Sequence, residues 1–257
     1  MEFTLKPFPF DQIGNENPSY LKHNAFIIVG ESFHANQHLI KDLLEYHKDI
    51  PAGIVITNSE KKPFYEEMIP SCFIHTKYSK TITENIQKRQ SQLFSKRNED
   101  PEIDRRIFVI FDCFEDPNWQ KDKKIRWMLD LGRTFSIVSI FIFPKPIRIT
   151  PRFYACFDFV FLLKENLIPN EDSYKNYCQM ISKDVYEELM NQLELHEYLV
   201  LHLYTRNDDL DSIFYYKGTQ KPSFKLFSEE VWQMNDQIEF DGNSKNCHHS
   251  WLLLGAE

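Results

Sequence analysis

The sequence has little glycine, no long hydrophobic run and no pairing pattern among its cysteines. It contains 7 glycines in 257 residues, few for an enzyme that wraps its backbone around phosphate groups. No apolar run approaches the roughly 18 residues of a membrane-spanning helix, so we expect no membrane insertion. The five cysteines are odd in number and far apart, which favours free thiols in a reducing compartment. The net charge of −8 argues against a general polyanion binder.

Hydrophobic residues are abundant, and they make up 42% of the chain, with 22 Phe and 12 Tyr. Apolar runs that predict strands cover residues 26–29, 52–57, 71–74, 107–111, 137–143, 157–163, 198–204 and 212–216. Segments that predict helices cover residues 37–48, 64–68, 80–98, 123–132 and 174–195. The three central strands, at residues 107–111, 137–143 and 157–163, are apolar on both faces. We therefore predict an α/β fold with a mostly parallel sheet and helices on both faces.

An incomplete phosphate-binding loop follows the first long strand. Residues 26–29 end in Gly30, and a helix begins a few residues later. Strand, loop and helix form the framework of a P-loop, whose signature is G-x-x-x-x-G-K-[ST]. Counting from Gly30, the second glycine falls on Ala35, the lysine on Asn36 and the hydroxyl residue on Gln37. The framework indicates an ATPase, and the changed residues argue against one.

A second position of P-loop ATPases is an acidic residue at the end of a buried strand, where it holds Mg²⁺ or orients water. Here residues 107–111 run directly into Asp112. A single aspartate at a strand end is more often a turn former or a helix cap. Its occurrence together with the loop at Gly30 favours descent from a functional site.

Four stretches have the order and spacing of known motifs: residues 30–47, 109–123, 131–166 and 210–232. Together they resemble the poxvirus-type genome-packaging ATPases of nucleocytoplasmic large DNA viruses, in the FtsK/HerA-like group of P-loop proteins. The resemblance implies a P-loop NTPase-like domain over residues 1–232, with residues 233–257 as a carboxyl-terminal tail. It implies a degenerate nucleotide site with Asp112 as the catalytic acid if the protein is active. The other residues of that site are Gly30, Ser32, Ala35, Asn36, Gln37 and Arg133.

The departures from the family fall on the catalytic positions. Asn36 matches the family's lysine and cannot place a positive charge between the terminal phosphates. Gln37 matches the hydroxyl ligand of Mg²⁺, and Phe111 stands where the family usually has a second acid. Ile142 matches a glutamine, and Tyr154 matches an arginine in the loosest part of the alignment. Because each charge-stabilising group is typically worth about 10²–10⁵ in rate, we expect the fold to be kept and the activity lost.

We therefore predict a non-catalytic pseudo-ATPase that acts as a structural or assembly protein of a large DNA virus. Its expected location is the viral factory of the host cytoplasm or the virion. The expected partners are viral proteins, such as an active packaging ATPase or capsid proteins, in an oligomer, and no cofactor is expected. The alternative is an ATP-dependent DNA-packaging translocase with a divergent active site, which would use ATP, Mg²⁺ and DNA. A nucleotide or DNA binder that never hydrolyses is a third hypothesis.

Two groups of potential metal ligands have weaker patterns. His34 and His38 are four residues apart, and Cys247 precedes His248 and His249 near the end of the chain. We interpret the first pair as a solvated helix start and the second group as an ordinary tail, so no metal site is expected. A basic stretch over residues 77–97 and 121–126 contains interspersed acids, which favours a solvated face over a DNA-binding one.

Overall fold

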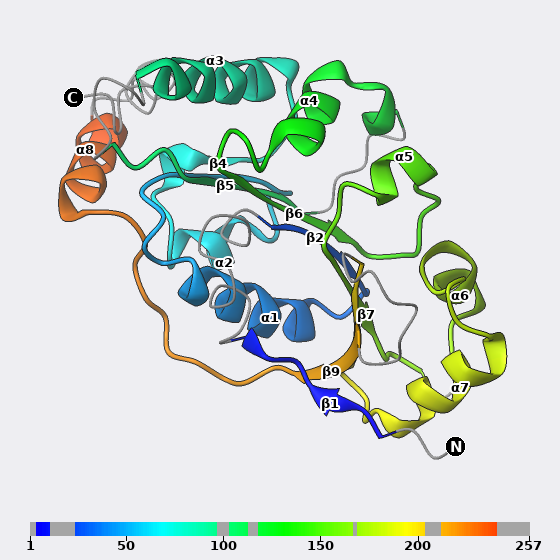
Figure 1. The fold of residues 1–257 in the computed structure, drawn as a ribbon. Coiled ribbons are helices and arrows are strands. Elements are labelled where there is room, and N and C mark those ends of the chain that lie inside the picture. The colour runs from blue at the N-terminus through cyan, green and yellow to red at the C-terminus, as the bar shows by residue number, and fades with distance from the viewer. Residues whose placement is uncertain are drawn as a thin grey trace. The chain divides into compact units, whose positions relative to one another are not determined.

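The structure is a computed structural model that describes residues 4–10, 24–96, 103–112, 118–166, 169–203 and 212–240 (Figure 1). The chain forms two compact units. The first consists of Met1–Leu43 and Phe141–Lys221, and the second of Leu44–Ile140 and Pro222–Glu257. The chain passes between them within helix α1 (Phe33–Tyr46) and strand β6 (Ile137–Phe143). The predicted α/β fold with a mostly parallel sheet and helices is confirmed.

Strands of the first unit hydrogen-bond in the order β1-β9-β8-β7-β2. Their bounds are Lys6–Pro7 for β1, Ile213–Lys217 for β9, Glu197–His202 for β8, Phe159–Leu163 for β7 and Ala25–Val29 for β2. β2 and β7 are parallel, with Val29 opposite Leu162, whereas β8 is antiparallel to both β7 and β9. The carboxyl ends of β2 and β7 therefore lie side by side.

The last helix predicted for the first unit is divided in the structure. The single helix predicted over residues 174–195 is wrong, because two helices occupy this region: α6 (Glu171–Tyr177) and α7 (Lys183–Gln192). Ser182 causes the second start, since its side-chain oxygen accepts a hydrogen bond from the amide of Val185 at 3.3 Å as an N-cap. The short helix α5 (Pro151–Tyr154) precedes β7.

The second unit contains parallel strands in the order β5-β3-β4, with the first residues of β6 beside β5. The strand bounds are Ile107–Asp112 for β5, Gly53–Ile56 for β3 and Ile74–His75 for β4. The strand predicted over residues 71–74 begins instead as the 3-10 turn η2 (Ser71–Phe73). Every residue of β5 is buried, as expected for a strand covered on both faces.

Helices α2 (Lys62–Glu66), α3 (Lys80–Lys96), α4 (Lys123–Leu131) and α8 (Glu229–Phe240) belong to the second unit. The 3-10 turn η3 (Trp119–Lys121) leads into α4. α3 and α4 pack against each other (Figure 1). Asp122 starts α4, because its carboxylate accepts the amide of Lys124 at 2.7 Å and that of Ile125 at 3.3 Å. Residues 233–240, which the sequence analysis assigned to a tail, are the last part of α8.

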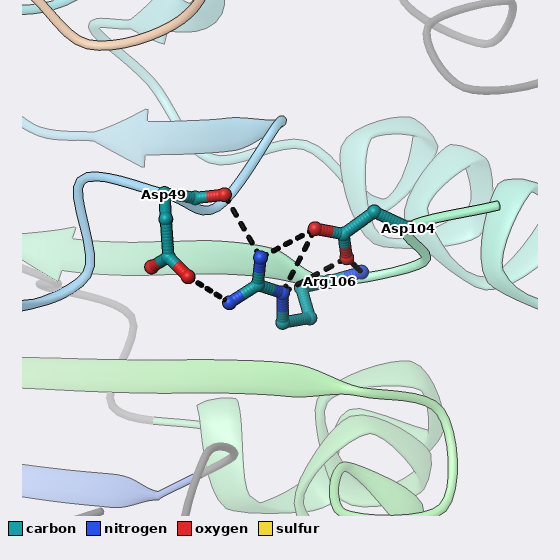
Figure 2. Close-up of polar contacts among 3 residues, drawn as sticks. All are labelled: Asp49, Asp104 and Arg106. Atoms are coloured by element: carbon teal, nitrogen blue, oxygen red, sulfur yellow. Dashed lines mark hydrogen bonds and ion pairs between the residues drawn. The ribbon is translucent and has the colours of Figure 1, made fainter. Parts of the chain in front are cut away.

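A cluster of Arg106, Asp104 and Asp49 holds the amino end of β5 (Figure 2). The Nε of Arg106 donates to both carboxylate oxygens of Asp104 at 2.9 Å, and its Nη2 donates to the backbone carbonyl of Asp49 at 2.9 Å. Hydrogen bonding to Asp104, assisted by Asp49, raises the pKa of Arg106 above its ordinary value. The cluster joins the turn before β3 to the start of β5, at the opposite end of that strand from Asp112.

Candidate functional site

Gly30 follows β2 and is required there by packing. Its amide donates to the carbonyl of Phe143 at 3.0 Å. A Cβ atom at this position would lie 2.6 Å from both Cβ and Cδ2 of Leu163, the last residue of β7. No side chain fits at that separation, so the close approach of the two strand ends explains the glycine without a phosphate.

Asn36, at the position of the P-loop lysine, is turned into the protein. Its side chain is buried, with the residue only 2% exposed. The Nδ2 atom donates to the carbonyl of Gly30 at 2.9 Å, and Oδ1 accepts a hydrogen bond from the hydroxyl of Tyr198 at 2.7 Å. Burial raises the pKa of Tyr198 well above its ordinary value, so this hydroxyl remains a donor. Asn36 thus joins the loop to β8.

The backbone amides of the loop hold a carboxylate of the same chain. Oε1 of Glu165 accepts a hydrogen bond from the amide of Ser32 at 2.8 Å and another from the amide of Glu31. Glu31 and Ser32 are the last two residues before α1, and free backbone amides at the start of a helix are groups that bind phosphate. The side chain of Glu31 itself is more than half exposed and pairs with Lys145, Nζ to Oε1, at 3.3 Å.

Glu165 was not predicted from the sequence as a residue of this site. The available signal was its position two residues after the buried strand β7, because ligand sites in α/β sheets lie beyond the carboxyl ends of the strands. The pairing itself joins residues that are 133 positions apart for Ser32. No local pattern predicts such a contact.

Two other predicted loop residues, Ala35 and Gln37, belong to α1 in the structure. Ala35 is buried, and its amide donates to the side-chain oxygen of Ser32 at 3.4 Å. Gln37 is half-buried in the first turn of α1. The structure therefore gathers the predicted residues of the loop in the first unit.

Asp112 ends β5 in the second unit and is only 1% exposed. Both of its oxygens have partners: Oδ1 pairs with Nζ of Lys61 at 2.8 Å, and Oδ2 accepts the hydroxyl of Tyr65 at 2.9 Å. Lys61 directly precedes α2 and its side chain is 17% exposed. An ammonium group of the same chain thus stands where Mg²⁺ would need a free carboxylate.

Arg133 lies apart from Asp112. It is exposed in the turn between α4 and β6, and its carbonyl accepts the amide of Ser136 at 3.3 Å. The carbonyl of Ser136 in turn accepts the amide of Ile107 at 3.0 Å, at the amino end of β5. Because Asp112 is the last residue of β5, the structure does not bring Arg133 to the carboxylate.

Ile142 and Tyr154, which also depart from the family's pattern, have structural roles in this chain. Ile142 is buried in β6. Tyr154, which matches a family arginine, donates from its hydroxyl to the carbonyl of Tyr177 at 2.8 Å and ties α5 to α6. Burial raises the pKa of Tyr154 above its ordinary value.

Over the part of the chain that the structure describes, no three His, Cys, Asp or Glu side chains gather as metal ligands. Cys247, His248 and His249 lie outside the described residues, as does part of the basic stretch. None of the described helices is long and apolar enough to cross a membrane.

Sequence comparison finds viral relatives, and the chain matches no protein-family model. An uncharacterized protein of Acanthamoeba polyphaga mimivirus is 24% identical over 222 residues, which cover 82% of this chain and 78% of that protein. An uncharacterized protein of Frog virus 3 (isolate Goorha) is 27% identical over 206 residues, 77% of this chain and 62% of that protein. An uncharacterized protein of Invertebrate iridescent virus 3 is 24% identical, with 83% and 84% covered.

Structure comparison finds a viral packaging NTPase and a conjugation coupling protein with the same fold. The genome packaging NTPase of Sulfolobus turreted icosahedral virus 2 in complex with sulfate has a TM-score of 0.52 at 14% identity, covering 78% of this chain and 99% of that one. Its complex with ATP-gammaS gives a TM-score of 0.50 at 15% identity, with 79% and 99% covered. The pCW3 conjugation coupling protein TcpA gives 0.52 at 11% identity, with 94% and 75% covered. At these identities the likeness shows the fold alone.

Proposed function

We propose that this chain is a packaging-NTPase-like protein of a large DNA virus that does not hydrolyse ATP and serves as a structural or assembly protein. The observation that carries the proposal is the carboxylate of Glu165 on the loop amides of Glu31 and Ser32. Two amides at the start of α1, which an anion could otherwise bind, are thus occupied by a side chain of the same chain.

The phosphate side of the site does not fit ATP. A phosphate approaching the loop would meet the negative charge of Glu165 instead of a lysine. Two like charges about 4 Å apart repel by about 4 kcal/mol at an effective dielectric constant of about 20. Asn36, held by Gly30 and Tyr198, supplies no positive charge to offset this repulsion.

The acidic position at the end of β5 does not fit Mg²⁺ either. Mg²⁺ needs carboxylate, hydroxyl and phosphate oxygens, and the carboxylate of Asp112 is neutralised by Lys61 at 2.8 Å. Gln37 offers no hydroxyl group. We therefore derive no hydrolytic step for this site, and the proposal includes no cofactor.

The viral relatives support a viral origin, and the fold shared with a genome packaging NTPase supports a role during virus assembly. The proposed location is the viral factory of the host cytoplasm or the virion. The proposed partners are viral proteins, with an active packaging ATPase and capsid proteins as the first to test, and the protein is proposed to act as part of an oligomer.

The test is a pair of measurements on the purified protein. ATP turnover is measured with and without double-stranded DNA, and ATP-gammaS is titrated by calorimetry with and without Mg²⁺. We expect turnover at the level of a protein-free blank and no binding heat. DNA-stimulated turnover that disappears in Asp112→Asn but persists in the exposed control Asp130→Asn would overturn the proposal in favour of the DNA-packaging translocase. Binding without turnover would instead identify a nucleotide-binding protein.

A further inference from the structure

Lys164, the residue before Glu165, is held by two hydrogen bonds. The amide of Lys164 donates to the carbonyl of Glu197 at 2.8 Å. The buried ammonium group of Lys164 donates to the carbonyl of Leu193 at 2.6 Å. Since β7 and β2 end side by side, this anchor presents the carboxylate of Glu165 to the loop that follows β2.

The loop is also held from the protein interior. Tyr198 donates to Asn36, and Asn36 donates to the carbonyl of Gly30. Burial chiefly, and the charge of Glu165 in addition, raise the pKa of Tyr198. Glu165 and Asn36 therefore both hydrogen-bond to the backbone of this loop, and Tyr198 holds Asn36 in place.

A nearer acid is available and is not used. Glu31 belongs to the loop itself, and its exposed side chain pairs with Lys145 instead. The amides of the loop bind the carboxylate of Glu165, which follows β7 and is more than a hundred positions away in the sequence. A pocket lined in part by Gly30, Pro144, Glu165 and Asn166 lies on one side of this carboxylate.

We propose that Glu165 is an autoinhibitory plug, whose carboxylate occupies the loop amides in place of a phosphate group and keeps the loop closed to anions. The inference rests on the proposed function and deepens it: anion binding is blocked by one side chain, and loss of the lysine is only part of the cause. Removing the charge at position 165 then exposes a site for the phosphate class of anion.

The experiment compares Glu165→Ala with the matched control Glu31→Ala, which removes the same group from the same loop without freeing its amides. Inorganic pyrophosphate is titrated by calorimetry, and the amide resonances of Glu31 and Ser32 are followed by nitrogen-15 NMR. We expect Glu165→Ala to bind pyrophosphate at least about tenfold more tightly than the wild type or Glu31→Ala. The two amide protons should move upfield in the variant and return downfield with pyrophosphate.

Glu165→Gln, which keeps the size of the side chain, is measured in parallel in case the alanine variant does not fold. Equal pyrophosphate affinity in the wild type and both variants would overturn the proposal. So would a folded variant whose two amide resonances have moved but which binds no pyrophosphate. Either result leaves the proposed function standing, because that fails only on ATP binding or turnover by the wild-type protein.

Discussion

The side-chain amide of Asn36, near the start of α1, donates a 2.9 Å hydrogen bond to the carbonyl of Gly30 in the loop before that helix. In a P-loop, the residue at this position is a lysine that reaches toward the phosphates. Here the side chain closes the loop on itself, and Tyr198 completes its hydrogen bonding. The asparagine at this position therefore provides a structural link and carries no charge.

Asn36→Lys alone should destabilise the protein by about 1–3 kcal/mol, because the carbonyl of Gly30 and the hydroxyl of Tyr198 lose their buried partner. It should not produce ATP binding, since Glu165 still occupies the loop amides. Urea unfolding measures the first effect and calorimetry the second. The control Gln37→Thr, at the next and less buried residue, should change stability by less than about 0.5 kcal/mol. An Asn36→Lys variant as stable as the wild type would contradict the assigned link.

Lys61 and Asp112 should be energetically coupled. Lys61→Met leaves a buried carboxylate with only Tyr65 as a partner, and we expect it to cost about 2–4 kcal/mol. Asp112→Asn added to Lys61→Met should restore part of this loss, with a coupling energy of about 1–3 kcal/mol in a double-mutant cycle by urea unfolding.

The matched control for this cycle is Lys62→Met, at the neighbouring lysine. Lys62 forms a more exposed pair with Glu66 at 2.9 Å, so its loss should cost less than about 0.5 kcal/mol. Additive effects of Lys61→Met and Asp112→Asn would show that the ion pair contributes nothing.

The predicted strands were largely correct because buried strands in a parallel sheet are read directly from continuous apolar runs. Ile107–Asp112 and Ile137–Phe143 agree with the expected runs to within one residue. The predicted helix over residues 174–195 was wrong because helical periodicity continues across Cys178–Ser182, while the cap at Ser182 starts a new helix. The N-cap hydrogen bond of Ser182 sets the start of α7, and the spacing of apolar residues does not reveal it.

The partners of the candidate site residues could not be predicted from the sequence. The sequence locates the loop and Asp112, since both follow buried strands. It does not reveal that Glu165 binds the loop or that Lys61 pairs with Asp112, because both contacts join residues brought together only by strand order. For the same reason Gly30 suggested a phosphate cradle, whereas the structure shows a packing requirement against Leu163.

His202 should make stability depend on pH. Its ring stacks on Phe159 with centroids 4.5 Å apart, and burial lowers its pKa below the ordinary 6.5, with Asp158 opposing the shift. The unfolded chain therefore binds this proton more readily, so stability contributed by the neutral ring is lost as pH falls below about 6.5. In His202→Phe the aromatic ring remains and the titration is absent. The wild type should lose more stability than the variant between about pH 8 and about pH 5 in urea unfolding; parallel losses would contradict this.

Repair of the loop should require removal of the plug. The triple variant Ala35→Gly, Asn36→Lys, Gln37→Thr rebuilds the P-loop signature, and backbone amides supply much of the affinity of such loops for phosphate. With Glu165 in place, however, the amides of Glu31 and Ser32 remain occupied, so the triple variant should bind ATP-gammaS no better than the wild type in calorimetry. Adding Glu165→Ala should produce binding, whereas adding Glu31→Ala should not.

Hydrolysis should stay at background in every combination, because Phe111 and Ile142 are not the acid and the glutamine expected at those positions, and Lys61 still pairs with Asp112. Binding by the triple variant alone would show that lysine can displace the carboxylate, and that the missing charge at position 36 is what closes this site.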